Sequence, residues 1–351
     1  MSHWYWNYFF IFTGTLALSL MITPLFRMLA EKVDLMDRPK VEAHKGHGKA
    51  TPLLGGAAMF TAWFVALGAG VIVMRSFPGV ASVSWRLFFL VLGAFLAMLL
   101  GLLDDKLALK AGPKFAGQFL VALVAVTLGG ASFSAFCPWP WVGTAASVFW
   151  FMLLMNSINF FDNMDGLAVG TVTIALGLFA VVAGLNEQYF VASFAALGSG
   201  AAAGFWYYNR APAMIFMGDS GSHFLGYLAA VTSCLVTYFN PGQSLSRFPV
   251  LAPLFILAVP LFDTLMVVII RYRLGKPFWI GDHNHISHRF TRIGLTRPRA
   301  VLLVHLMALA IGLGIFPVMW GDFSTAAVVV AQALLLLLIV SIMQFSLATK
   351  K

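Results

Sequence analysis

The sequence predicts an all-α membrane protein, built as a bundle of about eleven transmembrane helices. Hydrophobic residues make up 60% of the 351 residues and charged residues only 10%, a balance outside the range of soluble domains. The apolar residues gather in stretches long enough to cross a bilayer as helices. The few charged residues lie mostly between those stretches, as they do in proteins that cross the membrane several times.

About eleven apolar stretches are long enough to span the membrane. They cover approximately residues 7–29, 53–74, 85–103, 115–136, 141–161, 166–185, 188–208, 220–239, 248–270, 300–319 and 324–346. The first stretch is too long for a cleaved signal peptide, and it lacks a basic leading segment and a small-residue cleavage site. No linker, low-complexity tract or internal repeat separates the stretches, so we expect a single integral-membrane domain over residues 1–351.

Positive charge predicts the orientation of the helices. If the N-terminus lies outside, all but three of the 22 lysine and arginine residues share the face of the C-terminus. The exceptions are Arg75, Arg86 and Arg247. The positive-inside rule then places the basic face and the C-terminus in the cytoplasm. The expected cytoplasmic loops lie around residues 30–52, 104–114, 162–166, 209–219 and 271–299.

The net charge is +9, and loop 271–299 is strongly basic. A polyanionic partner at the cytoplasmic surface would explain this charge, and so would contact with anionic lipid headgroups. The two cysteines, Cys137 and Cys234, are too few for a disulfide framework or a cysteine metal site.

Asp104 and Asp105 form an adjacent acid pair at the cytoplasmic end of the third stretch, in the segment GLLDDK. A helix C-terminus disfavours negative charge, and adjacent carboxylates disfavour each other's ionisation unless a cation intervenes. The lysines that follow, Lys106, Lys110 and Lys114, could compensate part of this charge. We therefore favour a substrate or metal site over a solvated helix end.

Asn156, Asn159, Asp162 and Asp165 recur every three residues near the cytoplasmic end of the fifth stretch. Three-residue steps keep side chains on roughly one face of a helix. Four polar groups on that face would be costly toward lipid, so we expect them to point into the bundle. Their oxygens suit Mg²⁺ or Mn²⁺ better than zinc. Polar contacts between helices would account for Asn156 alone.

Two further acids stand at apolar stretches. Asp219 opens the eighth stretch, where an aspartate is an ordinary N-cap, but a helix N-terminus also attracts phosphate. Gly218 and Gly221 beside it allow close backbone approach, so one residue could be both cap and ligand. Asp263 lies inside the ninth stretch, where an acid is a functional candidate. Its expected partner is a lysine or arginine of the neighbouring loops.

The segment GDHNHISHRF, residues 281–290, places His283, His285, His288 and Arg289 close together. Such histidines can bind zinc, but the carboxylate-rich surroundings favour hard-cation chemistry. Arg289 can fork onto phosphate oxygens, and histidines can donate to them. We expect this segment to recognise phosphate, the alternative being charge that only sets the topology.

In this order and spacing the motifs resemble the polyprenyl-phosphate N-acetylhexosamine-1-phosphate transferase family, of the glycosyl transferase family 4 type. The resemblance covers nearly the whole chain. It is carried by TPLLGG at 51–56, GLLDDK at 101–106 with KFAGQ at 114–118, NSINFFDNMDGLA at 156–168, NRAPAMIFMGDSGS at 209–222, PLFDTL at 260–265 and HISHR at 285–289. The last motif is similar to the branch that uses undecaprenyl phosphate and UDP-GlcNAc or related UDP-hexosamines.

The resemblance implies transfer of a sugar-1-phosphate from a UDP-sugar to undecaprenyl phosphate, with release of UMP. This would be the first membrane step of cell-envelope polysaccharide synthesis, in the bacterial plasma (inner) membrane with a cytoplasmic active site. Implied ligands of Mg²⁺ (or Mn²⁺) are Asp219 and Asp105, and implied catalytic residues are Asp104, Asp105, Asp162 and Asp165. Residues expected to bind substrate are Asn156, Asn159, Asn209, Phe216, Lys114, Asp263, His285, His288 and Arg289. Among these, Asn209 and Phe216 match family positions that contact the uracil ring.

Two positions depart from the family pattern. Ser287 stands where this branch usually has a histidine, and Asn163 follows Asp162 where a glycine is common. The first departure bears on donor specificity, and the second on a backbone position expected near the nucleotide. Neither bears on the reaction class.

Two other functions compete with this one. A phospho-MurNAc-pentapeptide transferase would carry three consecutive histidines followed by an acid, which this sequence lacks. An ion-coupled secondary transporter would place polar groups at the bilayer midplane on broken helices, whereas these acids lie at helix ends. The expected partners are a UDP-sugar donor, an undecaprenyl phosphate acceptor and membrane lipids, with no nucleic acid; a homodimer is compatible with the sequence.

Overall fold

The computed structural model describes residues 2–38, 50–74, 80–133, 139–239, 247–279 and 284–348. The inner part of the expected loop 30–52, Cys137 and residues 280–283 with His283 lie outside the described residues. Two short strands, β1 (Met36–Asp37) and β2 (Thr51–Pro52), pair in antiparallel fashion. The helices are α1 (Ser2–Lys32), α2 (Gly55–Met74), α3 (Val80–Leu107), α4 (Ala111–Thr127), α5 (Pro140–Phe161), α6 (Leu167–Leu185), α7 (Tyr189–Asn209), α8 (Gly218–Leu235), η1 (Phe248–Leu251), α9 (Ala252–Ile256), α10 (Ala258–Arg273), α11 (Ile286–Arg292), α12 (Arg297–Leu313), α13 (Ile315–Trp320) and α14 (Phe323–Ala348).

The helices confirm an all-α protein that crosses the membrane several times. Within the described ranges, eight helices are long and apolar enough to span a bilayer, and a bent helix pair would add a ninth. Each predicted stretch coincides with a helix or a helix pair, but α4, with 17 residues, is short for a full span. The number of eleven spans and the sides on which the termini lie remain predictions.

The ninth predicted stretch, 248–270, is not one continuous helix but a bent helix pair. Segments Phe248–Ile256 and Ala258–Arg273 meet at an angle of 69°. Pro260, in the first turn of α10, has no N–H to bond the carbonyl of Ile256. A hydropathy pattern contains no sign of this break because the residues on both sides of it are apolar.

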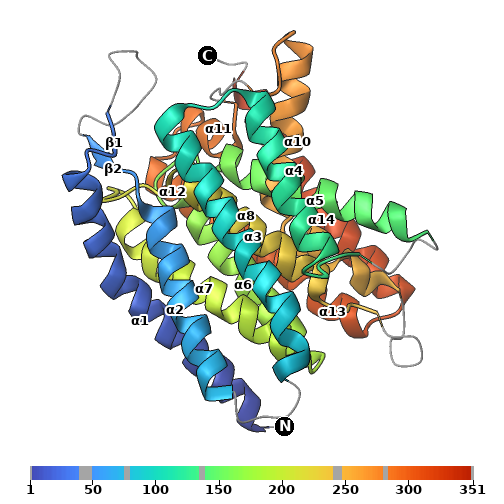
Figure 1. Cartoon of the computed structure of the whole chain (residues 1–351). Coiled ribbons are helices and arrows are strands. Elements are labelled where there is room, and N and C mark those ends of the chain that lie inside the picture. Colours follow the sequence, from blue (N-terminus) through green and yellow to red (C-terminus); the bar gives the residue numbers. More distant parts are fainter. Residues whose placement is uncertain are drawn as a thin grey trace.

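Helix α8 is the central element of the bundle (Figure 1). Every residue from Ser220 to Cys234 is buried, and α8 contacts α2, α3, α5, α6 and α7. A Cβ atom added to Gly101 of α3 would lie 2.2 Å from the carbonyl oxygen of Asp219. Only glycine therefore lets the end of α3 approach the α8 backbone this closely. The consequence is that the predicted acid pair of α3 lies beside the first turn of α8.

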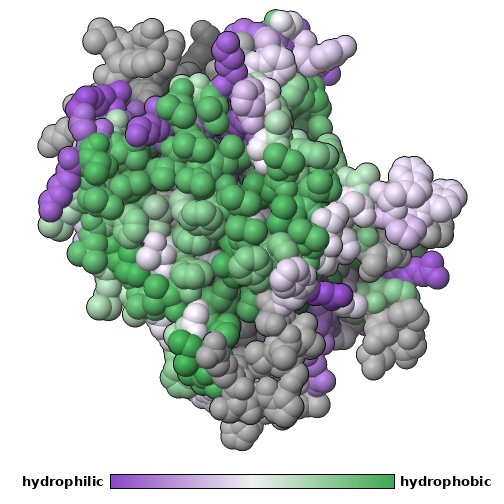
Figure 2. All heavy atoms as spheres, in the orientation of Figure 1, coloured by the Kyte–Doolittle hydropathy of each residue, from purple (hydrophilic) through white to green (hydrophobic). Residues whose placement is uncertain are grey.

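A broad apolar surface covers the flank of the bundle over α1, α2 and α3 (Figure 2). Large side chains such as Phe10 (63% exposed) and Met21 (70% exposed) point outward from α1. Hydrophilic residues gather above this belt, at the end where β1, β2 and α11 lie in Figure 1. This is the surface that a helix bundle presents to lipid tails, with polar groups where the bilayer ends.

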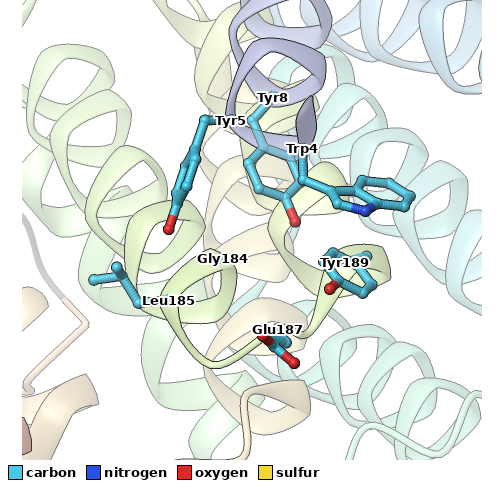
Figure 3. Close-up of a pocket in the computed structure, with 7 residues that line it drawn as sticks. All are labelled: Trp4, Tyr5, Tyr8, Gly184, Leu185, Glu187 and Tyr189. Atoms are coloured by element: carbon cyan, nitrogen blue, oxygen red, sulfur yellow. The ribbon is translucent and has the colours of Figure 1, made fainter. Parts of the chain in front are cut away.

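An aromatic pocket of about 220 Å³ lies at the other end of the bundle (Figure 3). Its walls come from the start of α1 and from the connection between α6 and α7, and Trp4 stacks on Tyr189 with ring centroids 4.2 Å apart. Tryptophan and tyrosine are typical of membrane–water interfaces. The pocket is at the C-terminal end of α6, whereas the predicted acids Asp162 and Asp165 precede its N-terminal end.

Candidate active site

Asp105 joins the end of α3 to the start of α8. Its Oδ1 accepts the backbone N–H of Asp219 at 2.7 Å and its Oδ2 accepts that of Ser220 at 3.1 Å. Gly218, with φ at +65°, lets the chain pass close to this carboxylate, since a Cβ there would lie 2.5 Å from Asp105 Oδ2. The C-terminus of α3 disfavours the negative charge of Asp105. The same carboxylate, however, lies at the N-terminus of α8, which favours negative charge. The expectation that Asp219 caps its own helix is wrong: the residue lies inside α8, and Asp105 does the capping.

Lys114 connects two of the predicted acids. Its Nζ lies 2.6 Å from Oδ2 of Asp104 and 2.8 Å from Oδ2 of Asp219. The other oxygen of Asp219 accepts Nδ2–H of Asn159 at 2.7 Å. Asp104 also accepts the backbone N–H of Leu109 at 2.8 Å, which fixes the short turn before α4. The expected compensation by Lys114 is confirmed for Asp104 of the acid pair, and both oxygens of Asp219 are held in place.

A second, buried hydrogen-bond chain supports this group from inside the bundle. Asn156 donates to Oε1 of Gln118 at 2.7 Å, and the Gln118 amide nitrogen lies 2.8 Å from Nε2 of His223. Nδ1 of His223 contacts the carbonyl of Asp219 at 2.7 Å, so the imidazole lies between the amide and the first turn of α8. Sequence reasoning did not assign roles to Gln118 and His223. They follow Lys114 and Asp219 by four residues and so share a helix face with them, which is the signal that could have identified them.

The predicted continuous polar face of the fifth stretch is interrupted. Helix α5 ends at Phe161, so Asn156 and Asn159 are helical but Asp162 and Asp165 are not. Asn163 donates from Nδ2 to the carbonyl of Phe160 at 3.1 Å, which satisfies one of the free carbonyls of the helix end. The extrapolation of helical spacing to Asp165 was wrong because nothing in that spacing marks the end of the helix.

Asp162 and Asp165 nevertheless lie near the other acids. Burial, with the charges of Asp219, Asp105 and Asp165, raises the pKa of the Asp162 carboxyl to about 8. Oδ2 of Asp165 accepts the backbone N–H of Ala213 at 3.0 Å and so holds the connection between α7 and α8. Asp162 is thus a half-buried acid on which the charges of Asp219 and Asp105 act, so it belongs to the same acidic group.

Asn209 is buried, and both ends of its amide contact the backbone. Oδ1 accepts the N–H of Gly166 at 3.1 Å, and Nδ2 donates to the carbonyl of Ile215 at 3.0 Å. These bonds tie the loop before α6 to the segment before α8. The structure gives Asn209 a positioning role, and direct contact with uracil stays a prediction.

Phe216 lies in the same segment. Its N–H donates to the carbonyl of Pro52 at 2.8 Å, and its carbonyl accepts the N–H of Gly55 at 3.1 Å. The backbone of Phe216 is therefore fixed to β2 and to the start of α2, while its ring is only half-buried. A ring presented in this way can stack on a flat ligand.

Asp263 anchors α11, the helix that carries the predicted phosphate-binding residues. Fully buried in α10, it accepts Nδ1–H of His285 at 2.7 Å and the backbone N–H of Ile286 at 2.6 Å. Among the described residues its partners are thus a histidine and a backbone group, where a lysine or arginine was expected. The Nδ1–H of His285 is used in this contact. Within α11, His288 is half-buried and Arg289 is 4% exposed.

The donor set fits a hard divalent cation that is completed by substrate. Among the described residues, no three aspartate, glutamate, histidine or cysteine side chains converge as a complete metal cage. Mg²⁺ in phosphoryl-transfer sites takes one or two carboxylates together with substrate phosphates. Asp219 offers such oxygens near Asp162, and the oxygens of Asp105 keep lone pairs besides the backbone N–H groups that they accept.

Known proteins are similar to this chain over the part that carries the acidic residues. The family model of Glycosyl transferase family 4 matches residues 87–237, the region that contains Asp104 to Asp219. A probable undecaprenyl-phosphate N-acetylglucosaminyl 1-phosphate transferase of Bacillus subtilis is 34% identical over 303 residues, covering 84% of this chain and 80% of the relative. A decaprenyl-phosphate N-acetylglucosaminephosphotransferase of Mycolicibacterium smegmatis is 31% identical over 323 residues, covering 84% of this chain and 79% of the relative.

A phospho-N-acetylmuramoyl-pentapeptide-transferase of Bacillus cytotoxicus is similar over less of this chain. It is 30% identical over 239 residues, which cover 62% of this chain and 72% of the relative. The matches to the two N-acetylglucosamine phosphotransferases extend over more of the chain. This multi-pass membrane protein is therefore an enzyme of glycosyl transferase family 4 and belongs to the polyprenyl-phosphate N-acetylhexosamine-1-phosphate transferases.

Proposed function

We propose that the protein transfers GlcNAc-1-phosphate, or a related hexosamine 1-phosphate, from a UDP-sugar to undecaprenyl phosphate and releases UMP. The reaction would depend on Mg²⁺ and take place at the cytoplasmic face of the bacterial inner membrane, as the first membrane step of an envelope polysaccharide. The observation that carries the proposal is the network of Asp104, Lys114, Asn159 and Asp219 at the start of α8. Carboxylates and an ammonium group held side by side, near the half-buried acid Asp162, are suited to binding two phosphorylated substrates.

The chemistry needs little proton transfer. The acceptor is a phosphate monoester, whose second pKa is about 6, so it is mostly dianionic at neutral pH. One of its oxygens would bond to the phosphorus that bears the sugar, while the bond from that phosphorus to the oxygen of UMP breaks. UMP leaves with the electron pair of that bond, and no general base is required. The main obstacle is repulsion between two anions.

The residues of the network would reduce this repulsion. Lys114 supplies a fixed positive charge, held by Asp104 and Asp219, toward which phosphate oxygens can be drawn. Asp219 and Asp105 would hold Mg²⁺, and when bound this ion supplies positive charge to the departing phosphate. Asn159 and Asp105 set the orientation of Asp219 and of the first turn of α8. Arg289 and His288 of α11 would hold the diphosphate of the donor.

The direct test uses the purified protein with Mg²⁺, undecaprenyl phosphate and a panel of UDP-sugars that includes UDP-GlcNAc and UDP-MurNAc-pentapeptide. We expect UMP release and a new sugar–diphosphate lipid with UDP-GlcNAc or a related UDP-hexosamine. Product from UDP-MurNAc-pentapeptide alone would move the protein to the pentapeptide branch. Absence of UMP release with every donor would exclude the proposed reaction.

Phe216→Ala should raise the KM for the UDP-sugar about ten- to a hundredfold, because stacking of an aromatic ring on a base is worth roughly 1–3 kcal/mol. The KM for undecaprenyl phosphate should change little. Phe216→Tyr keeps the ring and serves as the control, with near wild-type KM values. If the lipid KM rises instead in Phe216→Ala, the nucleotide pocket lies elsewhere.

Cation binding should tighten as the pH rises toward 8. Because the pKa of Asp162 is raised to about 8, the carboxyl is protonated and neutral below that pH. A divalent cation bound beside it must then displace a proton, which weakens its apparent affinity by up to about tenfold per pH unit below the pKa. Mn²⁺ binding followed by electron paramagnetic resonance measures this without turnover.

The matched variant is Asp162→Asn, which should bind Mn²⁺ more weakly and with a flatter pH profile. A wild-type profile that does not change between about pH 6 and pH 9 would place the cation away from Asp162, because only a neighbouring proton couples to the metal.

A further inference from the structure

The two positions that depart from the family pattern contact each other in the structure. Oγ of Ser287 donates a hydrogen bond to Oδ1 of Asn163 at 2.5 Å, across 124 positions of sequence. Ser287 is fully buried in α11, and the amide nitrogen of Asn163 bonds the carbonyl of Phe160 at the end of α5. The asparagine amide is therefore used at both ends, once by its own helix and once by α11.

This contact gives α11 a second point of attachment. The first is Asp263 of α10, which accepts Nδ1–H of His285 and the N–H of Ile286. A helix of seven residues held at one end can still change its direction. With Ser287 fixed to the residue after Asp162, the position of α11 relative to the acidic group is determined from two sides. His288 and Arg289 follow directly in the chain, so this attachment also places them.

The sizes of the side chains indicate that the two departures are one change. Asparagine with serine has the same number of side-chain non-hydrogen atoms as glycine with histidine. An imidazole at position 287 would need the space that the Asn163 side chain occupies, because Ser287 has no exposed surface. Conversely, a glycine at 163 beside Ser287 would leave a gap and an unpaired buried hydroxyl.

We propose that Asn163 and Ser287 form a coupled positioning pair that sets α11 against the Asp162 loop and thereby tunes the affinity for the donor substrate. The pair touches no reacting atom and acts through His288 and Arg289. This proposal rests on the proposed function, because the donor diphosphate is assigned to those two residues. The proposal makes positions 163 and 287 interdependent, so a change at either position alone should lower the affinity for the donor substrate.

The test is a double-mutant cycle on the full-length enzyme, with KM values for the UDP-sugar and for undecaprenyl phosphate. Ser287→Ala and Asn163→Ala should each raise the donor KM about three- to tenfold, the fold-change that corresponds to one buried hydrogen bond. The double variant should be no worse than either single variant. The KM for undecaprenyl phosphate should stay within about twofold of the wild type in all three.

A pair exchange gives a stricter test. Ser287→His alone should overfill the contact and lower kcat/KM for the donor more than Ser287→Ala does. Adding Asn163→Gly to Ser287→His should restore kcat/KM to within about threefold of the wild type. Ser147→Ala is the matched control: this buried serine in the first half of α5 accepts the N–H of Phe133 at 2.8 Å, and its loss should leave both KM values unchanged.

Several results would contradict the proposal that Asn163 and Ser287 act as a coupled pair. Losses that multiply in the double alanine variant would show two independent residues, and so would failure of Asn163→Gly to rescue Ser287→His. A lower unfolding temperature of Ser287→Ala with an unchanged donor KM would reduce the contact to packing. Wild-type protein that releases no UMP would overturn the proposed function itself, whereas wild-type activity with multiplying losses would overturn only the pair.

Discussion

Replacing Asp219 with asparagine should abolish sugar-1-phosphate transfer while the protein still inserts and folds. Asparagine can keep the acceptor for Asn159, but it turns an N–H₂ group toward the ammonium of Lys114, which now lies 2.8 Å from Oδ2. Two donors then face each other, and the ion pair is lost. We expect turnover to fall at least about 10²–10³-fold, the range seen when a single group that stabilises transition-state charge is removed.

The measurement is UMP release over a range of Mg²⁺ concentrations, together with size-exclusion behaviour and unfolding temperature. Apparent Mg²⁺ affinity should fall along with turnover. Asp322→Asn is the matched control, since Asp322 also stands at the start of a helix and accepts the N–H of Thr325 at 2.9 Å. Wild-type turnover in Asp219→Asn would remove Asp219 from the catalytic group.

The positions of the helices could be predicted from the sequence, because span length and lack of charge are properties of the sequence alone. Breaks and ends could not be predicted equally well. The turn at Leu257 lies between two apolar segments, and the end of α5 at Phe161 lies inside a regular polar repeat. Both depend on single local features, the missing N–H of Pro260 and the side-chain bond of Asn163 to Phe160.

It could be predicted from the sequence that the acids come together, because the C-terminus of one helix and the N-terminus of its antiparallel neighbour lie at the same face of the bundle. The partner of each acid could not be predicted. Asp105 and Asp219 both stand at helix ends, and the sequence does not say which of them caps α8. The buried partner of Asp263 also depends on where α11 docks, which is a tertiary contact over 22 positions. Charge alone suggested a lysine or arginine there.

The closing prediction concerns Lys114, whose ammonium occupies the centre of the network. It lies 2.6 Å from Asp104, 2.8 Å from Asp219 and 3.3 Å from Oδ1 of Asn159, with 16% of its side chain exposed. Methionine has nearly the same length and no charge. In Lys114→Met the two acids would face each other and both anionic substrates without a fixed positive charge. We expect transfer to fall about 10²-fold or more, with a near-normal unfolding temperature.

Raising Mg²⁺ should not restore the activity of Lys114→Met, because Lys114 would hold phosphate oxygens directly as well as neutralise the acids. Lys110→Met is the control: Lys110 is the exposed residue four positions earlier, just before α4, and its loss should leave kcat within about twofold of the wild type. Initial rates of UMP release at several Mg²⁺ concentrations separate the two roles. Full recovery of Lys114→Met at high Mg²⁺ would mean that a free cation can replace the ammonium, so that Lys114 serves only to balance Asp104 and Asp219.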